Sequence, residues 1–140
     1  MIIRPARLAD SDGVLALRND PDAVRFSPSR EPVSAEEHAR WFPNAAAMSP
    51  LFYVAASLGT VAGFVRVDAL AWVSVAVAAA QRGRGLGREL VACAASIFPG
   101  DVRAQVHEEN VPSLRLFAAC GFRELHRDAP WVYFEMEKER

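Results

Sequence analysis

The sequence predicts an α/β (α+β) fold, in which a mixed, mostly antiparallel central sheet of six to seven strands is flanked by about four helices. Short apolar runs typical of strands alternate with helical patterns along the whole chain. The early runs follow one another closely and predict an antiparallel hairpin, whereas a strand–helix–strand crossover lies in the second half. The 140 residues suit a single domain over 1–140, large enough to bury its own core.

The chain is predicted to begin with a strand and a helix. An apolar run over residues 2–6 is typical of a short first strand. Asp10 or Asp12 is positioned to cap a helix that runs to about Asn19, because a carboxylate accepts hydrogen bonds from the free amides of a helix start.

A long loop and a second helix follow. Three prolines between residues 20 and 33 predict a loop, and loops of that length often carry function. Ser34 and Glu37 form a capping box that starts the helix. Pro43 disfavours helical geometry in the residue before it, so we expect this helix to end or kink at Phe42.

Three strands are predicted next. Residues 51–56 and 61–68 form a hairpin around a tight turn at residues 58–60. Residues 72–77 alternate in character and form the third strand. The valines of this strand share one face: Val73, Val75 and Val77.

The second half of the chain alternates helices and strands. A glycine-rich turn at residues 83–87 opens an amphipathic helix, which Pro99 and Gly100 end. Gly121 is expected to cap the last helix in the left-handed conformation. The remaining predicted elements are a helix over 112–120 and strands over 102–106, 122–125 and 132–136.

The composition argues against several classes of protein. A formal net charge of −1 does not suit a nucleic-acid binder that neutralises many phosphates. The sequence has no apolar run long enough to span a membrane and no signal-peptide pattern, so a cytoplasmic location is the expectation. Cys93 and Cys120 lack metal-ligand spacing and are expected to be buried free thiols.

The glycine-rich turn is the most informative segment, because a strand leads into it and a helix leaves it. Glycine lets the backbone approach a ligand closely, and the free amides of a helix start attract anions. The glycines occupy every second position: Gly83, Gly85 and Gly87. Arginines add positive charge around them: Arg82, Arg84 and Arg88. A phosphate or pyrophosphate is therefore the predicted occupant.

The type of phosphate ligand follows from the exact pattern. The turn lacks the lysine and hydroxyl residue of a Walker loop, and Arg88 stands where the dinucleotide fingerprint needs a glycine. The pattern Arg82-x-x-Gly85-x-Gly87 instead resembles the pyrophosphate signature of the GNAT superfamily of acyl-CoA-dependent N-acyltransferases. A second pattern of that family, Asn110-x-x-Ser113-x-x-x-Phe117-x-x-x-Gly121-Phe122, follows in the expected order. The predicted elements match the family over nearly the whole chain.

The resemblance implies a set of roles for cofactor binding. The backbone amides from Arg82 through Leu86 to Gly87 would hold the pyrophosphate of acetyl-CoA. Val75 and Val77 would pair with the pantetheine arm, and the Val77 amide is our candidate oxyanion donor. The side chains that would border the pantetheine near the thiol are Asn110 and Ser113. The amine would then attack the thioester directly, without a covalent enzyme intermediate and without a metal.

The resemblance leaves the proton transfers open. Many members of the family have a tyrosine acid where Phe117 stands, and phenylalanine cannot protonate the departing thiolate. Protonation by water or another residue, a slower enzyme that relies on positioning, and lost activity all remain possible. His107 is the candidate general base. Alternatively, His107 and the two glutamates after it are solvated loop residues.

In the resembled family, the first two helices and their loops form the acceptor side. The candidate acceptor residues there are Arg18, Asn19, Arg30, His38 and Trp41. Their pattern looks like the subgroup that acetylates nucleotide-linked amino sugars, and arginines beside an aromatic ring suit such a ligand. A subgroup that acetylates protein N-termini shares similar segments. Trp41 could equally dock its helix on the sheet.

Three kinds of protein fit these observations. An acetyltransferase acting on a small-molecule amine is the main prediction, and a non-catalytic acyl-CoA-binding module is the rival. A structural protein with a chance glycine turn is the third. The last strands often pair between subunits in the resembled family, which makes a homodimer an open expectation.

Overall fold

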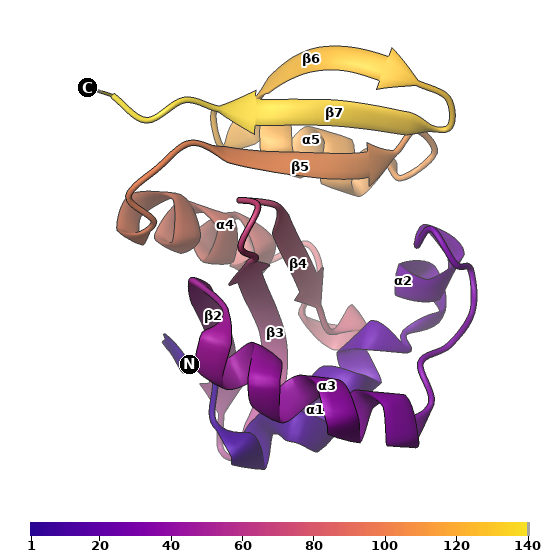
Figure 1. The fold of residues 1–140 in the computed structure, drawn as a ribbon, viewed down its shortest axis with the longest axis vertical. Coiled ribbons are helices and arrows are strands. Elements are labelled where there is room, and N and C mark those ends of the chain that lie inside the picture. Colours follow the sequence, from indigo (N-terminus) through magenta and orange to yellow (C-terminus); the bar gives the residue numbers. More distant parts are fainter. Residues whose placement is uncertain (140) are drawn as a thin grey trace.

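The computed structural model describes residues 1–139, whose strands form two antiparallel sheets (Figure 1). The first sheet has the order β1-β2-β3-β4, and the second has the order β5-β7-β6. The strands of the first sheet are β1 (Ile2–Pro5), β2 (Leu51–Ser57), β3 (Thr60–Val67) and β4 (Val73–Val77). Those of the second are β5 (Val102–His107), β6 (Arg123–Asp128) and β7 (Trp131–Met136).

Helices cover both faces of the first sheet and one face of the second (Figure 1). They are α1 (Ser11–Arg18), α2 (Pro21–Arg25), α3 (Ala35–Met48), α4 (Leu86–Ile97) and α5 (Val111–Ala119), with short 3₁₀ turns η1 (Leu8–Asp10) and η2 (Ala79–Gln81). Among the described residues, none of these helices is long and apolar enough to cross a membrane. The predicted fold class is confirmed.

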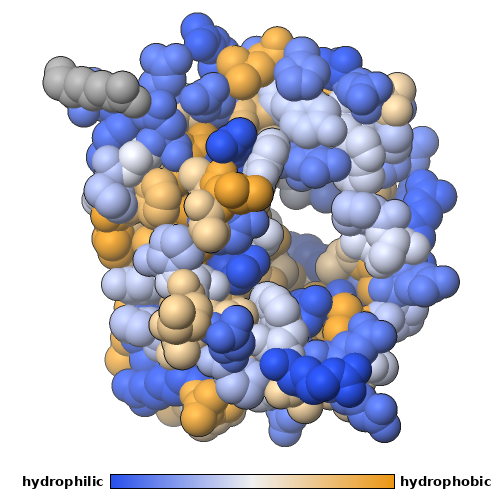
Figure 2. Space-filling view, in the orientation of Figure 1, coloured by the Kyte–Doolittle hydropathy of each residue, from blue (hydrophilic) through white to orange (hydrophobic). Residues whose placement is uncertain are grey.

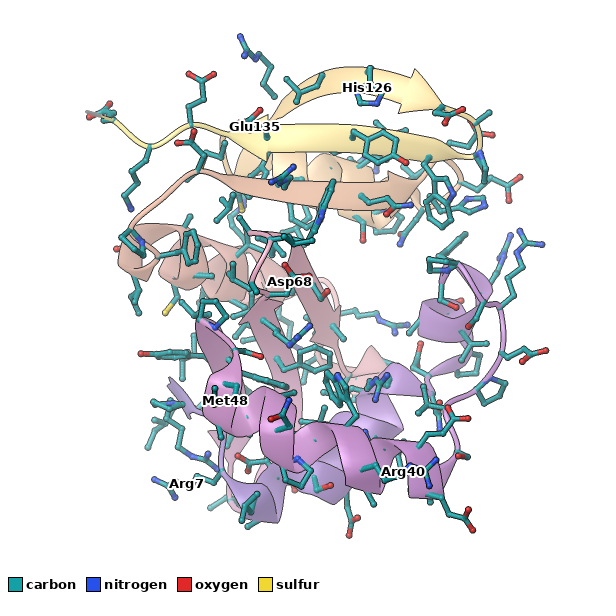
Figure 3. All side chains as sticks on the ribbon, viewed as in Figure 1. Arg7, Arg40, Met48, Asp68, His126 and Glu135 are labelled. Atoms are coloured by element: carbon teal, nitrogen blue, oxygen red, sulfur yellow. The ribbon has the colours of Figure 1, made fainter. Side chains whose placement is uncertain are left out.

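The expected central sheet is divided into two parts between β4 and β5. Close to their start the two strands share one isolated parallel bridge, between Trp72 and Arg103, where the Arg103 N–H donates to the Ala71 carbonyl at 2.9 Å. Asp68 holds the turn before β4, because its Oδ1 accepts from the amides of Leu70 and Trp72. In Figure 3, Asp68 lies at this junction of the two sheets. Beyond the bridge the strands separate.

Two apolar clusters hold the layers together. The larger lies under both sheets and around α4 and α5, and includes the fully buried Val65, Leu90 and Val132. The smaller lies on the opposite face of the first sheet, where α1 and α3 pack Val14 and Phe42 against β2 and β3. Because one cluster is shared by both sheets, the gap between β4 and β5 has a continuous apolar support.

Asp10 does not cap α1 through its side chain, contrary to one of the two capping predictions. Its buried carboxylate instead accepts two hydrogen bonds from Arg4, at 2.8 and 2.9 Å, and one from the Arg7 amide at 2.7 Å. The hydrogen bond from Arg4 is the main reason that the pKa of Asp10 lies below its ordinary value. The carboxylate therefore joins β1 to the turn that precedes α1.

The segment predicted as a loop contains a short helix, α2. Asp20 caps it by accepting from the amides of Asp22 and Ala23, and Pro21 stands at its first position. A proline there costs little, because its missing N–H has no helical partner in any case. The three prolines of this segment predict a loop, but Pro21 marks a helix start.

The helix that was predicted to end or kink at Phe42 does not end there, because α3 continues through Pro43 to Met48. An internal proline costs about 3 kcal/mol. Burying a phenylalanine side chain regains about 1.5–3 kcal/mol, and Phe42 is 0% exposed. Ala45, one turn further on, is also buried. Packing of this helix face on the sheet therefore offsets the local preference.

Candidate active site

The separated strands β4 and β5 turn backbone groups toward each other. The amide of Ala78 donates to Ala62 at 2.8 Å and that of Asp68 to Trp72 at 3.1 Å, which identifies the hydrogen-bonded pairs of β3 and β4. In an antiparallel pair these alternate with pairs whose groups point outward. The N–H and C=O groups of Val75 and Val77 therefore face the gap.

The opposite wall follows from the same reasoning. The Glu108 amide donates to Pro130 at 2.7 Å, which extends the pairing of β5 with β7 by one residue. The Gln105 backbone groups and the His107 N–H consequently point away from β7 and toward β4. The His107 carbonyl accepts from the Asn110 amide at 2.9 Å. Figure 2 shows an opening through the molecule here, between the second sheet and the segment that carries α2. An extended chain could pair with either strand edge.

The predicted anion turn lies at the end of this gap, after β4 and η2. Gly83 and Gly85 have φ values of 77° and 84°, and a Cβ on either would meet nothing within 4 Å. Gly85 is the N-cap of the twelve-residue helix α4 and offers no side chain to its first amides. These amides begin at Leu86, whose side chain is buried, and are open to an anion.

Gly87 differs from the other two glycines of the turn. It lies within the first turn of α4, and a Cβ there would come within 3.3 Å of the Leu116 side chain. Its lack of a side chain thus lets α4 approach α5 closely. The motif therefore combines two glycines in the left-handed conformation with one that serves helix packing.

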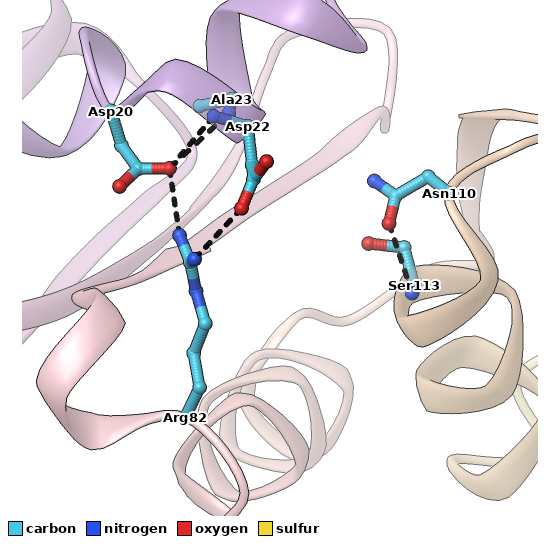
Figure 4. A network of polar contacts seen from close by, with 6 residues as sticks. All are labelled: Asp20, Asp22, Ala23, Arg82, Asn110 and Ser113. Atoms are coloured by element: carbon cyan, nitrogen blue, oxygen red, sulfur yellow. Dashed lines mark hydrogen bonds and ion pairs between the residues drawn. The ribbon is translucent and has the colours of Figure 1, made fainter.

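The arginines of the turn are not equivalent. Arg84 and Arg88 are exposed and have no carboxylate within ion-pair distance in residues 1–139. The guanidinium of Arg82 instead pairs with Asp20 at 2.7 Å and with Asp22 at 3.0 Å (Figure 4). Its side chain is therefore engaged with α2.

The second cofactor pattern lies across the gap from the glycine turn, at the start of α5. Asn110 caps this helix by accepting from the Ser113 amide at 3.4 Å (Figure 4). Gly121 ends it with a φ of 90°. The ring of Phe117 is 3% exposed and packs on Phe122, with ring centres 5.0 Å apart. Phe117 is therefore a core residue, although the resembled pattern has an acid at this position.

His107 ends β5 beside the gap and is 5% exposed. Its ring packs against Phe26 and Trp131, each with ring centres 5.4 Å away. The Glu109 amide donates to His107 Nδ1 at 3.1 Å. A neutral ring whose Nδ1 accepts must carry its hydrogen on Nε2. The geometry therefore favours a hydrogen-bond donor at this position over the lone pair that a general base needs.

Trp41 is the centre of the candidate acceptor side. The Arg18 guanidinium lies 4.2 Å from the centre of its ring and the Arg66 guanidinium 5.3 Å. Burial, followed by the charge of Arg66, lowers the pKa of Arg18. His38 is 2% exposed, contacts Arg18 through Nδ1 at 3.0 Å and donates from Nε2 to Ser11 at 2.9 Å. Two cations thus share one ring.

Arg66 was missed in the sequence, although a charged residue inside an apolar strand could have indicated it. It pairs with Ser74 of β4, and opposed residues of two strands share a face. Phe64 and Ala76, two residues further along, belong to the apolar cluster of α1 and α3. Arg66 therefore lies on the face of the first sheet opposite to α4.

Asn19 and Arg30 are not brought to Trp41. The Asn19 side chain donates to the Val33 carbonyl at 2.8 Å and accepts from the Val33 amide at 2.7 Å, which closes the segment around α2. Arg30 lies within that segment, exposed, with a φ of 57°.

Both cysteines are free and half-buried.

Comparison with known proteins identifies the family. The acetyltransferase (GNAT) domain family matches residues 1–123. The chain belongs to the GNAT acetyltransferases. A Bacillus subtilis protein, YwnH, which carries a provisional assignment as a phosphinothricin acetyltransferase, is 30% identical over 138 residues, with 89% of this chain and 85% of YwnH covered.

Two solved structures are similar to this GNAT acetyltransferase. One is a protein with a provisional assignment as a phosphinothricin N-acetyltransferase, 26% identical, with a TM-score of 0.83 and 99% of both chains covered. The other is the phosphinothricin acetyltransferase of Sinorhizobium meliloti in complex with acetyl-CoA. It is 20% identical, with a TM-score of 0.78, and the match covers 97% of this chain and 87% of that one. The present chain is an acetyl-CoA-dependent N-acetyltransferase.

Proposed function

We propose that this GNAT acetyltransferase moves the acetyl group of acetyl-CoA directly to the primary amine of a small molecule that also carries an acidic group. The main observation in support is the strand gap beside the glycine turn, with free backbone groups on both walls and an anion site at its end. The geometry suits a long, thin ligand with a pyrophosphate at one end.

The residues that would hold acetyl-CoA fit this description. The amides of Gly83 to Arg88, with the side chains of Arg84 and Arg88, would bind the pyrophosphate. The backbones of Val75 and Val77 would pair with the pantetheine arm. Asn110 and Ser113 would border it on the opposite side of the gap (Figure 4). Acetyl-CoA supplies an activated thioester, so the protein needs to position and polarise it.

The chemical step would use few side chains. The Val77 amide would donate to the thioester carbonyl and stabilise the negative charge that develops there. The amine nitrogen forms a bond to the carbonyl carbon, the carbon–sulfur bond breaks, and the amine proton leaves to water in the opening. We assign His107 to hydrogen-bond donation from Nε2 toward the departing sulfur, a role that Phe117 cannot take.

The acidic group of the acceptor is inferred from Arg18, Arg66 and Trp41. Neither guanidinium has a carboxylate partner in the part of the chain that the structure describes. Two partly buried cations beside one ring favour an anion with a planar or apolar part. Phosphinothricin, named for the relatives, is an amine with two acidic groups.

Other acceptors stay open. The relatives' names do not favour the nucleotide-linked amino sugar expected from the sequence, although the same arginines would suit its diphosphate. A protein N-terminus is a second alternative. A cytoplasmic location and a homodimer remain predictions, and a non-catalytic module is the outcome if acetyl-CoA binds but no amine is acetylated.

The first experiment is calorimetric titration of the purified protein with acetyl-CoA, with ATP as a control. We expect micromolar binding of acetyl-CoA alone. Gly85→Glu should abolish it, since a carboxylate would enter the anion site. Gly59→Glu is the matched control, because Gly59 has a φ of 80° and equally open surroundings in the β2–β3 turn. Equal affinity in the two variants would remove the glycine turn from the cofactor site.

The acceptor is tested by release of free CoA. L-phosphinothricin should be acetylated, and a simple alkylamine without an acidic group should be acetylated at least tenfold more slowly. Arg66→Gln should raise the KM for the acidic amine and leave the KM for acetyl-CoA unchanged. A preference for the alkylamine would contradict the acidic acceptor without touching the cofactor assignment.

A further inference from the structure

Helix α2 lies across the end of the gap at which the two sheets are not joined. At the other end the strands are joined by the bridge between Trp72 and Arg103. At the open end, α2 begins beside the cofactor turn, and the residue that follows its last turn, Phe26, contacts His107 of the second sheet. Arg25 also lies 3.9 Å from Glu109, as an exposed pair. The opening in Figure 2 is bounded by this segment.

The start of α2 is attached to the cofactor turn by Arg82. Its two ion pairs, at 2.7 and 3.0 Å, join residues that are 62 and 60 positions apart in the chain. The Asp20 carboxylate has a double role, because the oxygen that pairs with Arg82 also accepts from the first amides of α2. Burial would raise the pKa of Asp20, but the hydrogen bond and charge of Arg82 with the helix amides hold it below its ordinary value.

In the glycine-rich turn, the arginine that holds α2 differs from the arginines that are available to a pyrophosphate. Arg82 is the first residue of the pattern that marks the pyrophosphate site, and its amide already donates to Ala79 at 3.3 Å. Its guanidinium points to carboxylates and not to the glycine turn (Figure 4). Arg84, two residues later, is equally cationic and has no such partner among residues 1–139.

We propose that Arg82 is a positioning residue for the acceptor side. Its ion pairs hold α2 across the open end of the gap, so that Phe26 packs against His107 beside the incoming amine. The proposal rests on the proposed function of the gap as the place of acetyl transfer. Arg82 thereby couples the cofactor turn to the acceptor wall, while Arg84 and Arg88 serve the pyrophosphate.

The test compares Arg82→Gln with Arg84→Gln, two neutralised arginines of the same turn. Hydrogen–deuterium exchange of residues 20–26 and the acetyl-CoA Kd from calorimetry are measured for each. Arg82→Gln should speed exchange in α2 about fivefold, as expected for partly exposed ion pairs, and change the Kd by less than about twofold. Arg84→Gln should leave exchange in α2 unchanged and weaken acetyl-CoA binding. Weakened acetyl-CoA binding in Arg82→Gln with unchanged exchange would overturn the proposal.

Asp22→Asn provides a second variant that leaves the cap at Asp20 intact. Combined with Arg82→Gln, it should speed exchange no more than Arg82→Gln alone, and additive effects would show that the two residues act separately. With L-phosphinothricin as the probe amine, Arg82→Gln should raise the amine KM about fivefold and leave the acetyl-CoA KM within about twofold. The reverse pattern would also overturn the proposal.

The outcomes remain distinguishable from failure of the proposed function. If the wild-type protein binds no acetyl-CoA, the proposed function fails, while the exchange data still report on the anchor. If phosphinothricin is not acetylated, exchange and binding decide the role of Arg82 without any amine.

Discussion

At the scale of single residues, hydrogen bonds decide what a side chain can do. His107 was predicted as a general base from its type and its place after a strand. The amide of Glu109 occupies the lone pair of Nδ1, so the ring presents an N–H at Nε2. Phe117, expected beside the thiol, packs in the core against Phe122 and Phe134. Neither contact could be predicted from residue type alone.

If His107 acts as a hydrogen-bond donor, two substitutions of it should differ in turnover. His107→Phe should lower turnover by about a hundredfold, the lower range for loss of one hydrogen-bond donor to developing negative charge. His107→Gln should retain more activity, because its amide can donate from a similar position. Turnover is measured by CoA release, with the acetyl-CoA Kd and the unfolding midpoint as controls. Equal losses in the two variants would show that donation is not the function of His107.

At the scale of elements, tertiary contacts corrected two local predictions. The helix α3 continues through Pro43 because Phe42 and Ala45 are buried by the continued helix. The helix α2 forms because Asp20 caps it and Arg82 fixes that cap. The other helices and the β2–β3 hairpin agree with the periodicity of their sequences within a few residues. Element type was thus predictable wherever the local pattern was long.

Gly13 shows how packing can reverse a local preference. It lies inside α1, and a Cβ there would come within 2.7 Å of Val61 Cβ. Alanine normally stabilises a helix interior by about 1 kcal/mol relative to glycine. Overpacking costs about 1–3 kcal/mol, so Gly13→Ala should lower the free energy of unfolding by about 1 kcal/mol in urea titrations.

A rescue variant controls for the helix preference. Adding Val61→Gly to Gly13→Ala should make the alanine at 13 neutral or stabilising when compared with Val61→Gly alone, because both obstructing atoms, Val61 Cβ and Cγ2, are then removed. A gain in stability from Gly13→Ala alone would mean that α1 moves freely on β3.

At the scale of the whole molecule, the site is a property of the divided sheet. The two sheets share one apolar cluster and one backbone bridge, yet their neighbouring edges carry free groups at Val75, Val77 and Gln105 and at the His107 N–H. A ligand that pairs with both edges would complete the sheet. Cofactor binding is therefore expected to stabilise the fold as a whole.

Thermal unfolding measures this coupling. At a hundredfold excess over its Kd, acetyl-CoA should add about 2.7 kcal/mol to the stability of the folded protein. For a chain of this length that corresponds to a rise in Tm of about 10 °C. ATP should have no such effect, and Gly85→Glu should lose it. An unchanged Tm at saturating acetyl-CoA would contradict binding between the sheets.

The sequence by itself determined the local features of the site. Glycines in the left-handed conformation, the start of α4 and the cap at Asn110 depend on neighbours a few residues away, so their patterns are readable and point to acetyl-CoA. Only the tertiary structure decided the separation of β4 from β5, the pairing of Arg82 with Asp20, and the approach of Arg66 to Trp41. These contacts join distant parts of the chain. Packing of the whole core selects among them, and no local pattern records the choice.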